Sequence, residues 1–128
     1  MYVRFVVDEI DPDSGVQRGI FQAMYRLWRA GHLAPHEEAW WADVRAWFNL
    51  ELEEPERLAR SRRAGASQCA ISWFKASATE HIRRAREVVA LLAEHHVHSR
   101  MLRSDRPGYV VYEDEFQVTA EPFRPEHR

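Results

Sequence analysis

Cysteine and lysine are almost absent from this chain of 128 residues, which has one of each and no long apolar run. The single cysteine, Cys69, excludes an intrachain disulfide, as is usual for proteins of a reducing compartment. No apolar stretch approaches the roughly 20 residues that a membrane-spanning helix needs. The first residues read as a strand and not as a signal peptide. We therefore expect a soluble, cytoplasmic protein that does not bind a membrane.

The sequence also lacks the fingerprints of nucleotide, metal and catalytic sites. It contains neither GxGxxG nor GxxxxGK[ST], and it has no HExxH, CxxC or EF-hand pattern. His95, His96 and His98 stand close together, but histidines in a last helical turn also complement the helix dipole without a metal ion. We therefore expect no cofactor and no metal ion, and the chain favours a role other than enzyme.

Hydrophobic residues and arginines are what the chain has in abundance. Hydrophobic residues make up 45% of the chain and include five tryptophans, which predicts a folded domain. The length favours one domain, expected over residues 1–121, with residues 122–128 as a loose tail. The excess of arginine over lysine is typical of a GC-rich genome and suggests a bacterial protein. The alternative is that arginine was selected for bidentate contacts with phosphate or carboxylate.

Charge is distributed in blocks along the chain. Residues 1–56 carry a net charge of −6, residues 57–106 carry +7 and residues 107–128 carry −3, although the whole chain carries only −2. Such a chain either neutralises itself across the fold or presents one basic face to a partner.

Alternating apolar residues, helical spacing and turn signals predict the elements. Strands are expected at 2–10, 69–74, 97–103 and 109–112, with a further strand or a continuation at 116–120. Helices are expected at about 19–30, 35–54 and 77–95. Ser77 and Glu80 form the pattern of a capping box at the start of the last helix. The turn at 105–108 is expected to join the strands on either side of it as a hairpin.

The resulting order, βααβαββ, predicts an α+β fold. We expect a mainly antiparallel sheet of four to five strands with three helices on one face. The specific arrangement that we favour is ferredoxin-like with an added helix, although the order of the strands does not follow from the sequence.

Lys75 lies between a predicted strand and the helix that follows it, a position where many folds hold anions. If that strand ran parallel to the first strand, Lys75 would meet the acidic loop at 8–14 in a crevice. There Lys75 would neutralise an anion, Ser77 would cap the helix and His81 would transfer protons. The candidate ligand-binding residues are Lys75, Ser77, His81, Asp8, Asp11 and Asp13. The alternative is a surface lysine beside an ordinary cap and turn.

Two further groups of residues are candidates for binding a partner. The densest basic cluster consists of Arg57, Arg60, Arg62 and Arg63. It suits a nucleic-acid backbone or an acidic protein, although the acidic net charge of the chain argues against general nucleic-acid binding, and a solvated loop is the alternative. The other group is Trp40 and Trp41, which are adjacent and cannot both point straight into the core from one helix. One of them is therefore expected at the surface of a homodimer or of a complex with another protein.

Three functions stay open from the sequence. The first is a small binding module that engages a protein or a nucleic acid through the arginine-rich block at 57–106. The second is an enzyme or a binder of small anionic ligands built around Lys75. The third is a homodimeric subunit of a larger assembly.

Overall fold

The first strand, β1 (Tyr2–Ile10), is the centre of the sheet in the computed structural model, which describes residues 1–12, 15–53 and 70–123. The other strands are β2 (Gln17–Gly19), β3 (Ile71–Lys75), β4 (Ser99–Ser104), β5 (Tyr109–Glu113) and β6 (Gln117–Glu121). β1 pairs with β4 along one edge, and with β3 and then β2 along the other. The strand order is β2-β1-β3-β6-β5, with β4 beside β1, and every pair is antiparallel.

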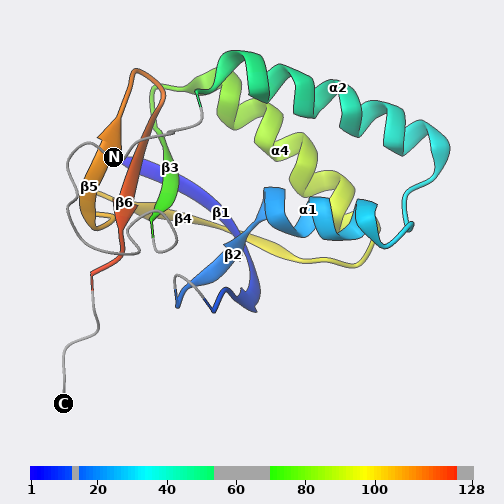
Figure 1. Cartoon of the computed structure of the whole chain (residues 1–128), viewed down its shortest axis with the longest axis horizontal. Coiled ribbons are helices and arrows are strands. Elements are labelled where there is room, and N and C mark those ends of the chain that lie inside the picture. Colours follow the sequence, from blue (N-terminus) through cyan, green and yellow to red (C-terminus); the bar gives the residue numbers. More distant parts are fainter. Residues whose placement is uncertain (13–14, 54–69, 124–128) are drawn as a thin grey trace.

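In the part of the chain that the structure describes, three helices cover one face of this sheet (Figure 1). They are α1 (Ile20–Arg29), α2 (Pro35–Glu51) and α4 (Thr79–Glu94). Val3, Phe5 and Val7 alternate along β1 and point into the hydrophobic core that the helices share with the sheet. Phe21 at the start of α1 contacts Phe48 near the end of α2, with ring centroids 4.8 Å apart, so the two helices run antiparallel as a hairpin.

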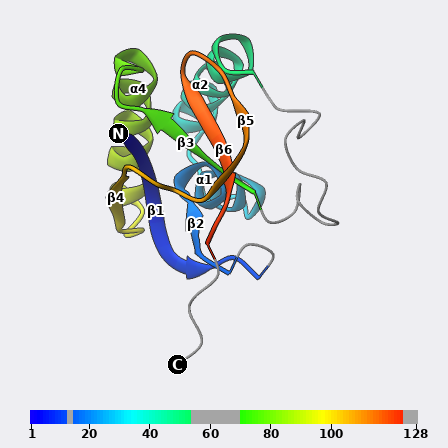
Figure 2. The same cartoon turned by 90° about the vertical axis from the view of Figure 1, so that its left-hand side faces the viewer.

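The sheet curls, and its inner face has a small core of its own. Figure 2 shows the curl, from β4 and β1 round to β6 and β5. Val6, Trp73, Val111 and Val118 are buried but do not belong to the core under the helices. The sheet therefore buries apolar side chains on both faces, and this explains the nearly continuous apolar run at the start of β1.

The predicted α+β class, the mainly antiparallel sheet and the three helices are confirmed. The structure adds the three-residue strand β2, which follows the turn at the end of β1 and had no pattern of its own. The predicted hairpin between β4 and β5 is wrong, because β4 pairs with β1 and β5 pairs with β6. The ferredoxin-like arrangement stays a prediction.

The predicted capping box at the start of α4 is also wrong. The N-cap is Ala78, and no side chain caps the helix. Glu80 instead accepts hydrogen bonds from Arg83 and from Arg84, 3.1 Å away, and Arg83 also reaches Glu87 at 2.8 Å. Glu80–Arg84 and Arg83–Glu87 are pairs at i, i+4, and the first of them occupies the carboxylate that the capping box required.

Gly108 precedes β5 in a conformation that other residues rarely adopt. Its φ is +152°, and a Cβ atom there would lie 2.0 Å from the carbonyl oxygen of Glu121. Only glycine fits at this position, because the backbone at the end of β6 occupies the space of a side chain.

Asp114 organises the tight turn between β5 and β6. Its carboxylate accepts hydrogen bonds from the backbone amides of Phe116 and Gln117, at 2.8 and 3.1 Å, and from the hydroxyl of Tyr112 at 2.9 Å. Burial raises the pKa of Asp114, but these hydrogen bonds outweigh it and leave the pKa below its usual value.

We expect Asp114→Asn to lower the free energy of unfolding by about 1–3 kcal/mol near neutral pH, because buried donors lose a charged acceptor. Since folding lowers the pKa of Asp114, this stabilisation is present above about pH 4 and is lost as the pH falls further. Urea unfolding of both proteins from pH 7 to pH 3 measures the effect. A difference that stays constant down to pH 3 would contradict the role of the ionised carboxylate.

Candidate functional site

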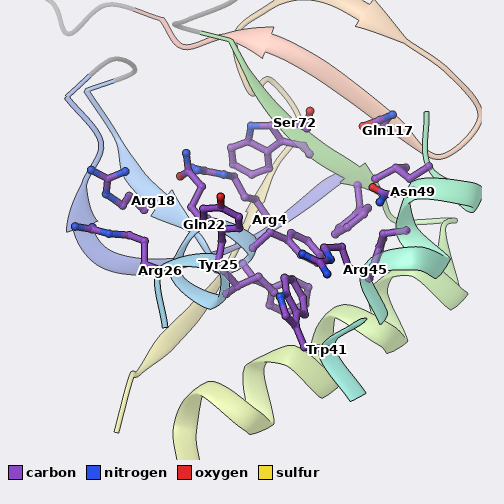
Figure 3. A pocket seen from close by; sticks show the side chains of 18 of the residues that line it. Arg4, Arg18, Gln22, Tyr25, Arg26, Trp41, Arg45, Asn49, Ser72 and Gln117 are labelled. Carbon is purple, nitrogen blue, oxygen red and sulfur yellow. The ribbon is translucent and has the colours of Figure 1, made fainter. Parts of the chain in front are cut away.

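A cleft opens where β1 changes its partner along one edge. β1 pairs with β3 at Tyr2 and Val3, and it pairs with β2 from Val6 onward. The two residues between these pairings, Arg4 and Phe5, line a cleft of about 830 Å³ among β1, β3, α1 and α2 (Figure 3). This volume lies within the range of small-molecule sites in proteins.

The wall of the cleft is largely aromatic and carries several positive charges. The aromatic side chains are Phe5, Phe21, Tyr25, Trp41, Phe48, Trp73 and Phe74. The charged side chains are Arg4, Arg18, Arg26, Arg45 and Glu53. Among the described lining residues, four guanidinium groups thus face one carboxylate.

Arg4 is the most deeply buried of these cations. Only 8% of the residue is exposed, and its Nη2 donates a hydrogen bond to the carbonyl oxygen of Gln17 at 2.7 Å. Burial lowers the pKa of Arg4 to about 10, and the negative charge of Asp11 offsets part of this effect. Arg4 therefore stays positive at neutral pH in a site where positive charge is costly.

Arg18 and Arg26 lie at the end of the cleft next to β1 and β2, where carboxylates balance them. Arg18 lies 3.3 Å from Glu9 and 3.7 Å from Asp11, and Arg26 forms an ion pair with Glu9. The hydrogen bond from Arg26 is the main reason why the pKa of Glu9 is below its usual value. These two arginines are rim residues with partners of their own.

Arg45 lies at the other end of the cleft and packs on aromatic rings. Its guanidinium carbon is 4.6 Å from the ring centre of Trp28 and 6.0 Å from that of Trp41. No described carboxylate is within ion-pair distance of Arg45. The contacts with the two rings fix the position of the guanidinium and leave its N–H groups available for hydrogen bonding.

Two tryptophans of the wall have buried indole nitrogens without an acceptor. Trp41 is 4% exposed and Trp73 is 8% exposed, and neither Nε1 has a hydrogen-bond partner. Buried donors are nearly always satisfied in folded proteins, and one that is not costs about 1–3 kcal/mol. The wall of the cleft therefore contains two buried donors without an acceptor.

The structure does not bring together the crevice that the sequence analysis expected around Lys75. The strands β1 and β3 are antiparallel, with Lys75 opposite Tyr2, so Lys75 lies at the far end of β1 from Asp8 and Asp11. Lys75 forms an ion pair with Glu113 at 2.8 Å. Asp8 is exposed, and Asp11 lies beside Arg18. Asp13 is outside the described residues.

His81 is a core histidine and Ser77 is exposed. The Nε2 of His81 donates to the carbonyl oxygen of Glu51 at 2.7 Å, and its ring lies against Phe116, with centroids 4.4 Å apart. This contact joins α4 to the last turn of α2. Lys75, Ser77 and His81 are thus neighbours in sequence without forming a shared pocket with the acidic loop.

The expected partner-binding residues have different outcomes. Trp41 is buried in the core of its own chain and is 4% exposed. Trp40 packs partly against the same core, and an interface there stays a prediction. The arginine cluster Arg57, Arg60, Arg62 and Arg63 lies outside the described residues. In the described parts of the chain, no three His, Cys, Asp or Glu side chains form a group suited to a metal ion. None of the described helices has the length and apolar character needed to cross a membrane.

Apart from Trp41, which was a candidate for binding a partner, sequence reasoning missed the residues that line the cleft. One signal was available: Arg4 interrupts an otherwise apolar run in the first strand, where an ordinary core strand has no cation. Arg45 gave no such signal, because a charged residue on a helix is most often exposed. A search of protein families, curated proteins and solved structures finds no match to this chain.

We expect His81→Ala to lower the free energy of unfolding by about 2–4 kcal/mol, because it leaves a cavity among aromatic rings and frees the carbonyl of Glu51. Urea unfolding measures this change. His32→Ala is the matched control, because His32 is exposed, and it should cost less than about 0.5 kcal/mol. Equal effects of the two substitutions would show that His81 is not a core residue.

We expect Arg4→Met to leave the free energy of unfolding within about 1 kcal/mol of the original or to raise it, because a buried cation is replaced by an apolar side chain of similar length. Val6→Ala, two residues along β1 at a fully buried position, should cost about 2 kcal/mol. Chemical denaturation compares the two variants. If Arg4→Met lowered the free energy of unfolding as much as Val6→Ala does, Arg4 would be a structural residue.

Proposed function

We propose that this protein binds a small anionic molecule with a flat, apolar body in the cleft between β1, β3, α1 and α2. The observation that carries the proposal is the buried Arg4 in an aromatic wall, which donates a hydrogen bond to a backbone carbonyl and forms no ion pair with a described carboxylate, although Asp11 offsets part of its charge. Proteins keep a buried cation of this kind where a ligand or a partner charge compensates for it.

The shape of the wall favours a flat ligand. Rings from two helices and two strands surround the cleft, and aromatic side chains bind flat molecules by stacking and by edge contacts. Arg45, itself stacked on Trp28, adds a second flat cationic surface. A flat molecule that carries a negative charge satisfies both features.

The polar groups favour binding over catalysis. Among the described lining residues there is no histidine, cysteine, aspartate or lysine, and Glu53 is the one carboxylic acid. General acid–base and nucleophilic chemistry near neutral pH depends mainly on such groups. The cleft is therefore better suited to holding a molecule than to transforming it.

Calorimetric titration with 2-naphthalenesulfonate, a flat anion, tests this function. We expect binding that is stronger than that of neutral 2-naphthol or of methanesulfonate, which lacks the flat body. Arg4→Met and Arg45→Met should each weaken the binding about tenfold or more, because each removes a charge-assisted contact.

Arg100→Met is the matched control, since Arg100 is an exposed arginine on β4 outside the cleft lining. It should change the affinity less than twofold. Equal binding of 2-naphthol and 2-naphthalenesulfonate, or equal losses in all three variants, would contradict an anion site in the cleft.

A further inference from the structure

The start of helix α1 opens into the cleft without a cap. Its N-cap residue is Gly19, no side chain accepts from the first amides, and the first turn contains no acidic residue. Gly19, Ile20, Phe21 and Gln22 all line the cleft. The first amides of a helix and its dipole attract anions, and an uncapped start leaves this attraction unused.

The guanidinium of Arg4 lies directly beside this helix start. A Cβ atom built on Gly19 would be 3.7 Å from Nη2 of Arg4, and the same nitrogen is held by the carbonyl oxygen of Gln17. Figure 3 shows Arg4 and Gln22 reaching the same part of the pocket. The positive charge of the buried Arg4 thus lies beside the positive end of the dipole of α1.

A second observation points to a missing acceptor independently of the helix. Trp73 and Trp41 are both more than nine-tenths buried in the wall of this cleft, and their indole nitrogens have no acceptor. Trp73 and Arg4 are each adjacent to the pair Phe74 and Val3, on the side where the pairing of β3 with β1 ends. The wall of the cleft therefore has buried indole donors without an acceptor, in addition to Arg4 and the open helix start.

We propose that the start of α1 and Arg4 form a phosphoryl site, and that the ligand of the cleft is a small phosphate monoester of a flat, ring-containing alcohol. This inference rests on the proposed function and names the chemical class of the ligand. A phosphate monoester carries about 1.5–2 negative charges and three acceptor oxygens. A phosphate therefore accepts hydrogen bonds from a guanidinium and from the first helix amides together. A carboxylate, which has one charge and two oxygens, matches this set of donors less well.

The orientation of the ligand follows from the arrangement of the cleft. The phosphoryl group lies at the end where Arg4 and Gln22 meet, and the ring extends past Tyr25 toward Trp41 and Arg45 (Figure 3). The rim residues Arg18 and Arg26 already have carboxylate partners, so they are secondary in holding the anion.

Titration of the full chain with 1-naphthyl phosphate and with 1-naphthoate tests the ligand class. We expect the phosphate to bind about tenfold more tightly or better, because it offers more acceptors to charged and dipolar donors. O-phosphotyrosine and 5′-AMP, titrated beside them, distinguish an aryl source of the phosphate from a nucleoside source. Backbone amide resonances of Phe21 and Gln22 should shift with 1-naphthyl phosphate in the unaltered protein.

Gly19→Asp tests the site itself. The φ of Gly19 is −73°, and the space around it accepts a Cβ atom, so aspartate can cap α1 and occupy the first amides. We expect at least a tenfold loss of 1-naphthyl phosphate affinity with an unchanged or higher thermal midpoint. Gly19→Asn, which caps without a charge, should also weaken binding and serves if the aspartate variant does not fold.

Ala34→Asp is the matched control, because Ala34 is the N-cap of α2, also lacks a side-chain cap, and does not line the cleft. It adds the same charge and should leave the affinity within about twofold. If flat anions bind but phosphate has no advantage and Gly19→Asp has no effect, the phosphoryl site is wrong and the proposed function stands. If no flat anion binds the unaltered protein, both proposals fail.

Discussion

The hydrogen bonding of one edge of β1 is the constraint on which the rest of the structure depends. A residue on a strand edge can pair with only one neighbouring strand, and this edge is shared by β3 and β2. Because β2 takes the second half of β1, β3 has to leave after two residue pairs. The sheet opens at that point, and α1 begins directly after β2. The cleft, its buried arginine and its open helix start all follow from this change of partner.

Electrostatics make this opening unusual. A gap between strands could be filled with apolar side chains, and the aromatic rings from α1 and α2 fill much of it. Arg4 instead places a charge where a core residue would stand, while Glu9 and Asp11 interact with Arg18 and Arg26 at the rim. The acidic residues nearby therefore balance the outer arginines and leave the inner one with only partial compensation from Asp11.

Apart from β2, the described elements of the fold could be predicted because each has a periodic apolar face, as the match of residues 2–10 to β1 shows. The pairing of the strands could not be predicted, because it depends on contacts between segments that are distant in the sequence. The candidate site at Lys75 depended on a parallel pairing, and one antiparallel pair moved Lys75 away from Asp8. Charge averaged over blocks was also misleading: four of the five arginines in the acidic block at 1–56 line the cleft. These four arginines are brought together by their positions in the fold, and not by being close together in the sequence.

Gly108 has a consequence for reading variation among any chains that share this fold. The carbonyl of Glu121 leaves no space for a side chain there, so selection retains glycine whatever the cleft binds. Invariance at position 108 therefore reports geometry and carries no information about chemistry. A chain that keeps Gly108 but has another residue in place of Arg4 or Arg45 would share this fold and bind a different ligand.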